Sequence, residues 1–144
     1  MRTRTLSHLL KSHKDTQKVF RGVYPCDKIP KSLPATSAII ANTDPHGESG
    51  QHWVAYFFTP KQVLYFDSFG LPPLTRELKL PMKMRRMPKY FGRRLQGQSR
   101  ACGHYCLYFI LAMIKGWKFT QFTNQLRQND IRVRKLVARH YIRN

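Results

Sequence analysis

The stretch that organises this chain reads Gly97-Gln98-Ser99-Arg100-Ala101-Cys102-Gly103, and an apolar run as far as Lys115 follows it. The run from Cys102 to Lys115 predicts the best helix of the chain, which Gly116 ends. A cysteine in the first turn of a helix meets unpaired N–H groups and positive potential, which favour its thiolate. Gly103 directly after it lets the backbone approach a carbonyl group closely. Cys102 is therefore a candidate nucleophile.

Two other interpretations of the cysteines are open. A cysteine on an apolar helix is often a buried structural residue, and this interpretation fits Cys106, one turn further along the same face, better than Cys102. A metal site formed by Cys26, Cys102, Cys106 and His104 is the second alternative. The Cys-x3-Cys spacing is not that of a standard zinc ribbon, so we expect no metal.

Two strand-like runs precede the helix. Residues His52 to Thr59 and Val63 to Asp67 are rich in aromatic and β-branched types and flank a Pro-Lys-Gln turn, which predicts a hairpin. Because His52 opens the first strand and Asp67 closes the second, pairing brings them close together. His52 is then a candidate base for the Cys102 proton, and Asp67 a candidate to orient its ring. Taken alone, Asp67 before Ser-Phe-Gly is also ordinary turn chemistry.

The other histidines are weaker candidates for the base. His8, His13, His46 and His140 lie in polar or helical surroundings without a paired acid nearby. His104 belongs to the predicted helix, but it points away from the face of Cys102.

A glutamine just ahead of the cysteine completes the constellation. The side-chain amide of Gln96, with the backbone N–H of Cys102, is a candidate donor to an oxyanion. Gln98 competes for this role, but Gly97 frees the backbone after Gln96. Trp53 and Gly103 are expected beside the substrate.

The remaining pattern predicts a small α+β fold, with one domain over residues 1–144. We expect a small mixed sheet and a central helix that carries Cys102 at its N-terminus. The other expected elements are a helix over 3–14, an irregular ordered segment over 20–34, a strand over 37–41, a strand over 90–95 and helices over 119–126 and 131–141. Residues 74–95 are the least predictable part, because they are basic and interrupted by prolines.

The charge of the chain is unusual. Its 144 residues contain 26 Lys and Arg against 7 Asp and Glu, a formal net charge of +19. Such an excess favours a polyanionic partner, and we expect DNA. The candidate DNA-binding residues are Lys83, Arg85, Arg86, Arg93, Arg94, Arg132, Arg134, Lys135 and Arg139. Which of these basic patches meets DNA stays open.

The composition of the chain also indicates in which cellular compartment the protein is expected. Three cysteines are too few for a disulfide scaffold, which favours a reducing intracellular setting. We see no signal peptide, and the longest apolar run, Leu107 to Ile114, is too short to span a bilayer, so we expect no membrane partner. The basic clusters are weak nuclear localisation signals.

Four segments in this order resemble the adenovirus endopeptidase (adenain) family. They are Phe20-Arg-Gly-Val-Tyr24; Ala41-Asn42-Thr43 followed by Gly47 to Trp53; Tyr65 to Gly70; and Leu95-Gln96-Gly97 followed by Ala101-Cys102-Gly103. The resemblance extends from about Phe20 to Phe109. Its order of His, acid, Gln and Cys is the reverse of the order in papain, which implies a papain-like core in permuted order.

The resemblance implies a thiol protease in which His52, Asp67, Gln96 and Cys102 act as base, orienter, oxyanion donor and nucleophile. It also implies DNA-stimulated cleavage of viral or virus-like precursor or capsid proteins at glycine-containing sites. The expected locations are then the host nucleus and the virion.

Three departures from the family are visible. Asp67 stands where the family usually has Glu. The segment between Gly70 and Leu95 is shorter, which predicts that a helix is missing there, and the C-terminal region is truncated. This segment has no cysteine that could tether a peptide activator, so the need for such an activator stays open, as does the oligomeric state.

Two alternatives compete with this interpretation. A ubiquitin-like-protein (SUMO-type) deconjugating protease shares the His-Trp, Asp, Gln and Cys-Gly features, but Ala101 stands where that family usually has Asp. A non-catalytic DNA-binding protein on the same fold is the other. The complete set of four candidate residues argues against it, because no structural role requires them together.

Overall fold

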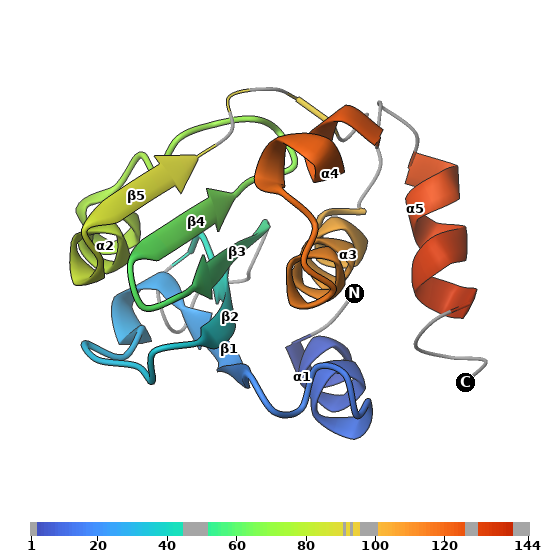
Figure 1. Ribbon diagram of the computed structural model, residues 1–144, viewed down its shortest axis with the longest axis horizontal. Helices are drawn as coiled ribbons and strands as arrows, with labels where there is room; N and C mark the ends of the chain where they lie inside the picture. The colour runs from blue at the N-terminus through green and yellow to red at the C-terminus, as the bar shows by residue number, and fades with distance from the viewer. Residues whose placement is uncertain are drawn as a thin grey trace.

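The computed structural model describes residues 3–44, 52–90, 92, 94–95, 101–125 and 130–139. Its centre is a five-stranded mixed sheet whose strands lie in chain order (Figure 1). The strands are β1 (Phe20–Pro25), β2 (Ser37–Asn42), β3 (Trp53–Phe58), β4 (Gln62–Phe66) and β5 (Met87–Tyr90). The inner strands β2, β3 and β4 pair antiparallel, whereas β1 and β5 pair parallel to their neighbours. The predicted hairpin, β3–β4, is confirmed.

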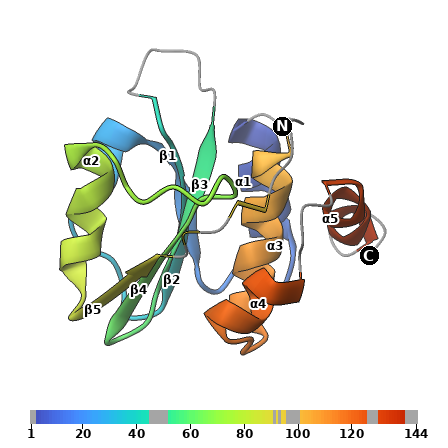
Figure 2. The ribbon, with the colours of Figure 1, turned by 90° about the horizontal axis from the view of Figure 1, so that it is seen from above.

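Helices cover both faces of the sheet (Figure 2). One face carries α1 (Thr3–Ser12), α3 (Cys102–Ile114) and α4 (Phe119–Gln125). The helix α5 (Asp130–Val137) packs on α3, on the side away from the sheet. The other face carries the short helix α2 (Arg76–Lys79) and the 3-10 turns η1 (Cys26–Lys28) and η2 (Leu80–Met84). The predicted α+β class with a central helix is confirmed.

The sheet lies between two apolar cores. Each strand contributes side chains to both cores, because successive side chains point to opposite faces of the sheet. In β3, Trp53, Ala55 and Phe57 face the core beneath α3. Val54 and Tyr56, in contrast, face the smaller core beneath α2. Burial on both faces explains why this strand is a continuous apolar run rather than a polar–apolar alternation.

Helix α3 is the central element of the larger core. It is apolar almost all round, because the sheet lies on one side of it and α1 and α5 on others. Phe109 stacks on Phe66 of β4 with ring centroids 4.8 Å apart. This packing fixes the helix against the strand that leads into Asp67, and so fixes the helix N-terminus relative to the end of β4.

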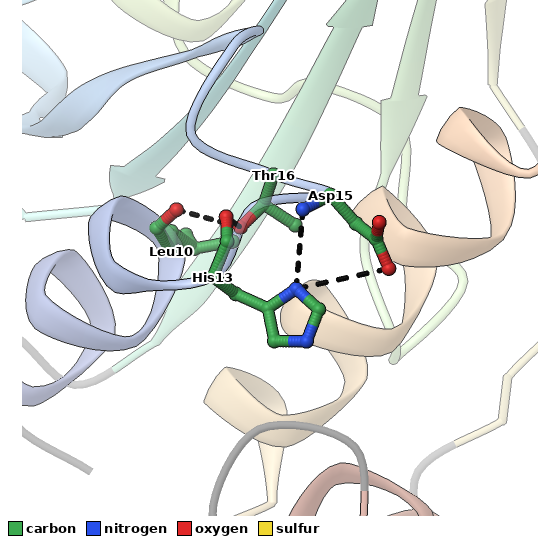
Figure 3. A network of polar contacts seen from close by, with 4 residues as sticks. All are labelled: Leu10, His13, Asp15 and Thr16. Atoms are coloured by element: carbon green, nitrogen blue, oxygen red, sulfur yellow. Dashed lines mark hydrogen bonds and ion pairs between the residues drawn. The ribbon is translucent and has the colours of Figure 1, made fainter. Parts of the chain in front are cut away.

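The end of α1 is held by a buried threonine (Figure 3). The Thr16 hydroxyl, which is fully buried, donates to the Leu10 carbonyl at 2.6 Å. Beside it the His13 ring accepts from the Asp15 backbone N–H at 3.2 Å. These bonds satisfy groups that the helix leaves unpaired and turn the chain toward β1.

The expectation of an irregular segment over 20–34 is wrong at its start, because Phe20–Pro25 forms β1. Gly22 explains the misleading pattern. It lies at φ 145°, where the pairing of β1 with β2 shifts register, and Tyr24 donates across the bulge to the Arg21 carbonyl at 2.7 Å. A glycine inside a strand often marks such a bulge rather than the absence of a strand.

Residues 74–95 hold more regular structure than the sequence predicts. The helix α2 and the 3-10 turn η2 occupy Arg76–Met84, and the helix expected to be missing relative to the adenain family stays a prediction. Thr75 caps α2, and Tyr56 donates to the Leu78 carbonyl at 2.6 Å. The predicted strand over 90–95 is also misplaced, because β5 ends at Tyr90 and residues 92, 94 and 95 are not strand.

Candidate active site

Cys102 is the first residue of α3, as predicted. Ala101 precedes it and offers no side chain to cap the helix, so the N–H groups of the first turn have no acceptor on the N-cap residue. The side chain is buried, with 7% of the residue exposed. The helix N-terminus therefore presents its positive end to a sulfur atom that water barely reaches.

His52 and Asp67 meet at one end of the β3–β4 hairpin. His52 directly precedes β3 and Asp67 directly follows β4, and the antiparallel pairing of Ala55 with Phe66 brings the start of β3 near the end of β4. Nε2 of His52 lies 2.7 Å from Oδ1 of Asp67. The side chains are only 14% and 5% exposed, so water screens the pair weakly.

A tight turn holds the carboxylate of Asp67 in place. The Phe69 backbone N–H donates to the same Oδ1 at 2.8 Å, and the Gly70 N–H donates to the Asp67 carbonyl at 2.8 Å. Gly70 has φ 75°, a conformation in which a side chain would be strained. The Phe-Gly pair after the acid thus builds the turn that aims the carboxylate at His52.

The imidazole also contacts the thiol of Cys102. Because Nε2 is bonded to Asp67, the remaining ring nitrogen, Nδ1, serves the hydrogen bond to Cys102. Burial lowers the pKa of His52, but the hydrogen bonds to Asp67 and Cys102 outweigh it and raise the pKa to about 9. These contacts therefore favour the protonated form of the ring.

The thiol shows the complementary effect. Burial alone raises the pKa of Cys102, yet the His52 hydrogen bond, the backbone N–H of Trp53, the charge of His52 and the backbone N–H of Gly103 together lower it below the ordinary thiol value. The sequence predicts Trp53 and Gly103 beside the substrate. The structure brings their backbone N–H groups to the sulfur atom.

These opposite shifts favour a thiolate–imidazolium ion pair. A negative sulfur and a positive ring stabilise one another, and the Asp67 carboxylate stabilises the ring from the other side. Such a pair supplies a nucleophile and a proton donor at the same place.

Two further contacts order the neighbourhood of His52, and the sequence analysis missed both. The imidazole stacks on the Phe69 ring, with centroids 4.6 Å apart and planes 19° apart. The Arg94 guanidinium lies 4.7 Å from the centroid of the same ring. Two signals could have drawn attention to Phe69: it lies in the Tyr65 to Gly70 segment of the resemblance, and it follows Asp67 by two residues in a turn rather than in the core.

Leu95 is fixed to the same turn. Its N–H donates to the Ser68 carbonyl at 2.8 Å, and its carbonyl accepts from the Tyr105 hydroxyl at 3.0 Å. Leu95 is fully buried. Residue 95 is therefore anchored both to the acid turn and to the helix of Cys102.

The pKa values of the remaining cysteines and of His104 shift in the directions opposite to those of Cys102 and His52. Burial raises the pKa of Cys106 and of Cys26, which disfavours their thiolates. Burial and the charge of Arg134 lower the pKa of His104 to about 4, and its buried Nδ1 has no hydrogen-bond partner among the described residues. All three cysteines are free, and no group of metal-binding side chains occurs in the described ranges.

Some predicted site residues lie outside the described residues. These are Gln96, its competitor Gln98 and the candidate DNA contact Arg93. The oxyanion donor therefore stays a prediction. Across the described parts of the chain, no helix is long and apolar enough to cross a membrane.

The predicted DNA-binding residues that the structure describes lie on separate parts of the surface. Lys83 and Arg86 are exposed beside β5, whereas α5 and the residues directly after it carry exposed cations on the far side of α3 (Figures 1 and 2). The cations of this second group are Arg132, Arg134, Lys135 and Arg139. Arg85 lies between the two exposed cations of the first group but bonds to the backbone, including the Thr59 carbonyl at 2.7 Å.

Comparison with known proteins shows which solved structures have a similar fold. No protein-family model and no curated protein matches the chain. A selenomethionine crystal structure of the ASFV pS273R protease is similar, with a TM-score of 0.58 and 25% identity over 76% of this chain and 45% of that chain. Another crystal structure of the ASFV pS273R protease gives a TM-score of 0.64 and 18% identity over 94% of this chain and 66% of that chain.

The chain thus spans less than two thirds of the length of these structures. Its fold is that of a papain-like viral protease, which confirms the predicted fold class. The finer resemblance to the adenovirus endopeptidase stays a prediction.

Proposed function

We propose that this chain is a cysteine endopeptidase in which Cys102 is the nucleophile, His52 the base and Asp67 the residue that orients His52. One observation carries the proposal. His52 contacts both the acid and the thiol, and the pKa of the ring is raised while the pKa of the thiol is lowered. Similarity to the fold of the ASFV pS273R protease supports it.

The reaction follows from these positions. The Cys102 thiolate attacks the carbonyl carbon of a peptide bond, and the carbonyl oxygen becomes an oxyanion. The backbone N–H of Cys102 and the side chain of Gln96 are the proposed donors to that oxyanion. His52 then gives its proton to the amine as the C–N bond breaks, which leaves a thioester on Cys102.

The second half of the reaction uses the same groups. His52, now neutral, takes a proton from a water molecule, and the resulting hydroxide attacks the thioester carbon. The C–S bond breaks, the carboxylic acid leaves, and the thiolate–imidazolium pair is restored. Asp67 keeps Nε2 protonated and facing it throughout, so that Nδ1 stays directed to the sulfur atom.

The finer function that we propose is cleavage of viral or virus-like precursor or capsid proteins at glycine-containing sites, with DNA as activator. The net charge of +19 supports the DNA part, because a polyanion would concentrate a cationic enzyme and its DNA-bound substrates. The exposed cations of α5 and those beside β5 are the proposed contact surfaces.

A peptide-cleavage assay tests the proposal. A fluorogenic peptide containing glycine is incubated with the wild type and with Cys102→Ala, and Cys106→Ala serves as the matched control because Cys106 lies one turn along the same helix. We expect cleavage by the wild type and by Cys106→Ala, and none by Cys102→Ala. Cleavage that survives in Cys102→Ala would overturn the catalytic assignment.

The same assay tests the activator and the substrate. Added duplex DNA should raise the rate, and the increase should fall steeply as salt rises. A rate that ignores DNA, together with faster cleavage of a ubiquitin-like precursor than of the glycine peptide, would favour a SUMO-type deconjugating protease instead. The assay is also run with an added synthetic peptide activator, to measure whether the peptide raises the cleavage rate.

A further inference from the structure

We propose that Phe69 is a positioning residue for His52, and that the Arg94 guanidinium over the Phe69 ring helps to hold that ring in place. The inference rests on the proposed function, because it concerns the ring that moves the Cys102 proton. It starts from the observation that Phe69 belongs to neither apolar core of the described residues. Its ring is half-buried and lies over an imidazole instead.

The Phe69 ring contacts two other flat groups. The His52 ring lies 4.6 Å from the Phe69 ring and nearly parallel to it. The Arg94 guanidinium lies over the same ring at 4.7 Å. The Phe69 ring thus contacts both the imidazole and the guanidinium.

His52 needs this second constraint. The Nε2–Oδ1 hydrogen bond fixes one ring atom, but the ring can still rotate about that bond and carry Nδ1 away from Cys102. A stacked neighbour fixes the plane of the ring. The Phe69 backbone N–H also holds Oδ1 of Asp67 at 2.8 Å, so one residue fixes both partners of the hydrogen bond.

The stack also favours the charged ring. The face of an aromatic ring attracts a cation, and this attraction grows where water is excluded. The imidazolium of His52 therefore gains from Phe69, and the thiolate of Cys102 gains in turn from the imidazolium. A side chain without a flat π face would give neither the fixed plane nor this attraction.

Phe69→Leu tests the inference, because it keeps the backbone N–H and the apolar bulk but removes the π face. The readout is the alkylation of Cys102 by iodoacetamide as a function of pH, followed by mass spectrometry. We expect the rate at pH 7 to fall about three- to tenfold. We also expect the midpoint of the pH profile to move up toward that of an ordinary thiol.

Three further variants separate positioning from simple destabilisation. Phe69→Tyr keeps the ring and should restore the wild-type profile. Phe119→Leu removes another half-buried ring, which packs edge-on to Phe109 at 5.7 Å and not on His52, and should leave the profile unchanged. Arg94→Gln should shift the profile in the same direction as Phe69→Leu but less, and it serves if Phe69→Leu does not fold.

The outcomes distinguish this inference from the proposed function. A wild-type protein in which Cys102 reacts no faster than Cys106 would overturn the proposed function itself. A fast wild-type reaction that Phe69→Leu leaves unchanged would overturn only the positioning role. The same holds if Phe69→Tyr behaves like Phe69→Leu, or if Phe119→Leu shifts the profile equally.

Discussion

Nε2 of His52 and Oδ1 of Asp67 lie 2.7 Å apart, although fifteen positions of the chain separate the two residues. The hairpin between them brings its two ends together, and the helix that packs on it delivers Cys102 to the other ring nitrogen. The site is thus built from one local element, the hairpin, and one long-range packing contact.

Asp67→Asn should slow peptide cleavage about tenfold or more, because the amide oxygen can still accept from Nε2–H but a neutral group stabilises the imidazolium less than a carboxylate does. The descending limb of the pH profile should also move to lower pH, since the carboxylate helps to raise the pKa of His52. Steady-state kinetics across pH measures both effects. Asp27→Asn, at an exposed carboxylate away from the site, is the control and should change neither.

The wild-type pH–rate profile should be bell-shaped. Activity should rise as Cys102 ionises, at a pH below the ordinary thiol value, because the pKa of this thiol is lowered. It should fall through about pH 9, where His52 loses the proton that the leaving amine requires. A descending limb near pH 6.5, the ordinary histidine value, would show that the ring is not held as an imidazolium.

Gly22→Ala should lower the free energy of unfolding by about 1–3 kcal/mol. Gly22 has φ 145°, and an added Cβ would lie 2.7 Å from the Tyr24 hydroxyl. Gly92→Ala is the matched control, because Gly92 has no positive φ and its nearest neighbour would lie 3.7 Å away. Urea denaturation measures both, and equal stability of the two variants would contradict the bulge assignment.

Arg85→Gln and Arg86→Gln should separate a structural cation from a surface cation. The Arg85 guanidinium donates to the carbonyls of Thr59 and Pro34 and lies 5.2 Å from the Phe58 ring, so its loss should cost about 2 kcal/mol of stability. Arg86 is exposed, so its loss should leave stability nearly unchanged. Thermal denaturation provides the comparison, and an equal effect of the two changes would be inconsistent with these roles.

Local patterns explain why part of the molecule could be predicted. The apolar run after Cys102 and the alternation around a Pro-Lys-Gln turn each encode their own element, so α3 and the β3–β4 hairpin follow from neighbouring residues. Because the hairpin is local, the proximity of His52 and Asp67 could be predicted as well.

Long-range contacts explain the rest. Strand β1 is stabilised by its parallel pairing with β2. The glycine bulge interrupts the strand-like pattern of its residues, so the strand could not be predicted from neighbouring residues alone. Helix α2 is short and basic, and its stability depends on Leu78 reaching the core and on a bond from Tyr56. The contacts among His52, Phe69 and Arg94 join residues from three segments of the chain. The spacing of these residues in the sequence therefore could not predict the contacts.

Competitive alkylation of the three cysteines at pH 7 measures whether His52 activates Cys102. We expect iodoacetamide to modify Cys102 at least about a hundredfold faster than Cys26 or Cys106, since only the Cys102 thiol has a lowered pKa. We also expect His52→Ala to remove most of this advantage. Similar rates at the three cysteines, or an advantage that survives in His52→Ala, would contradict the activation of Cys102 by His52.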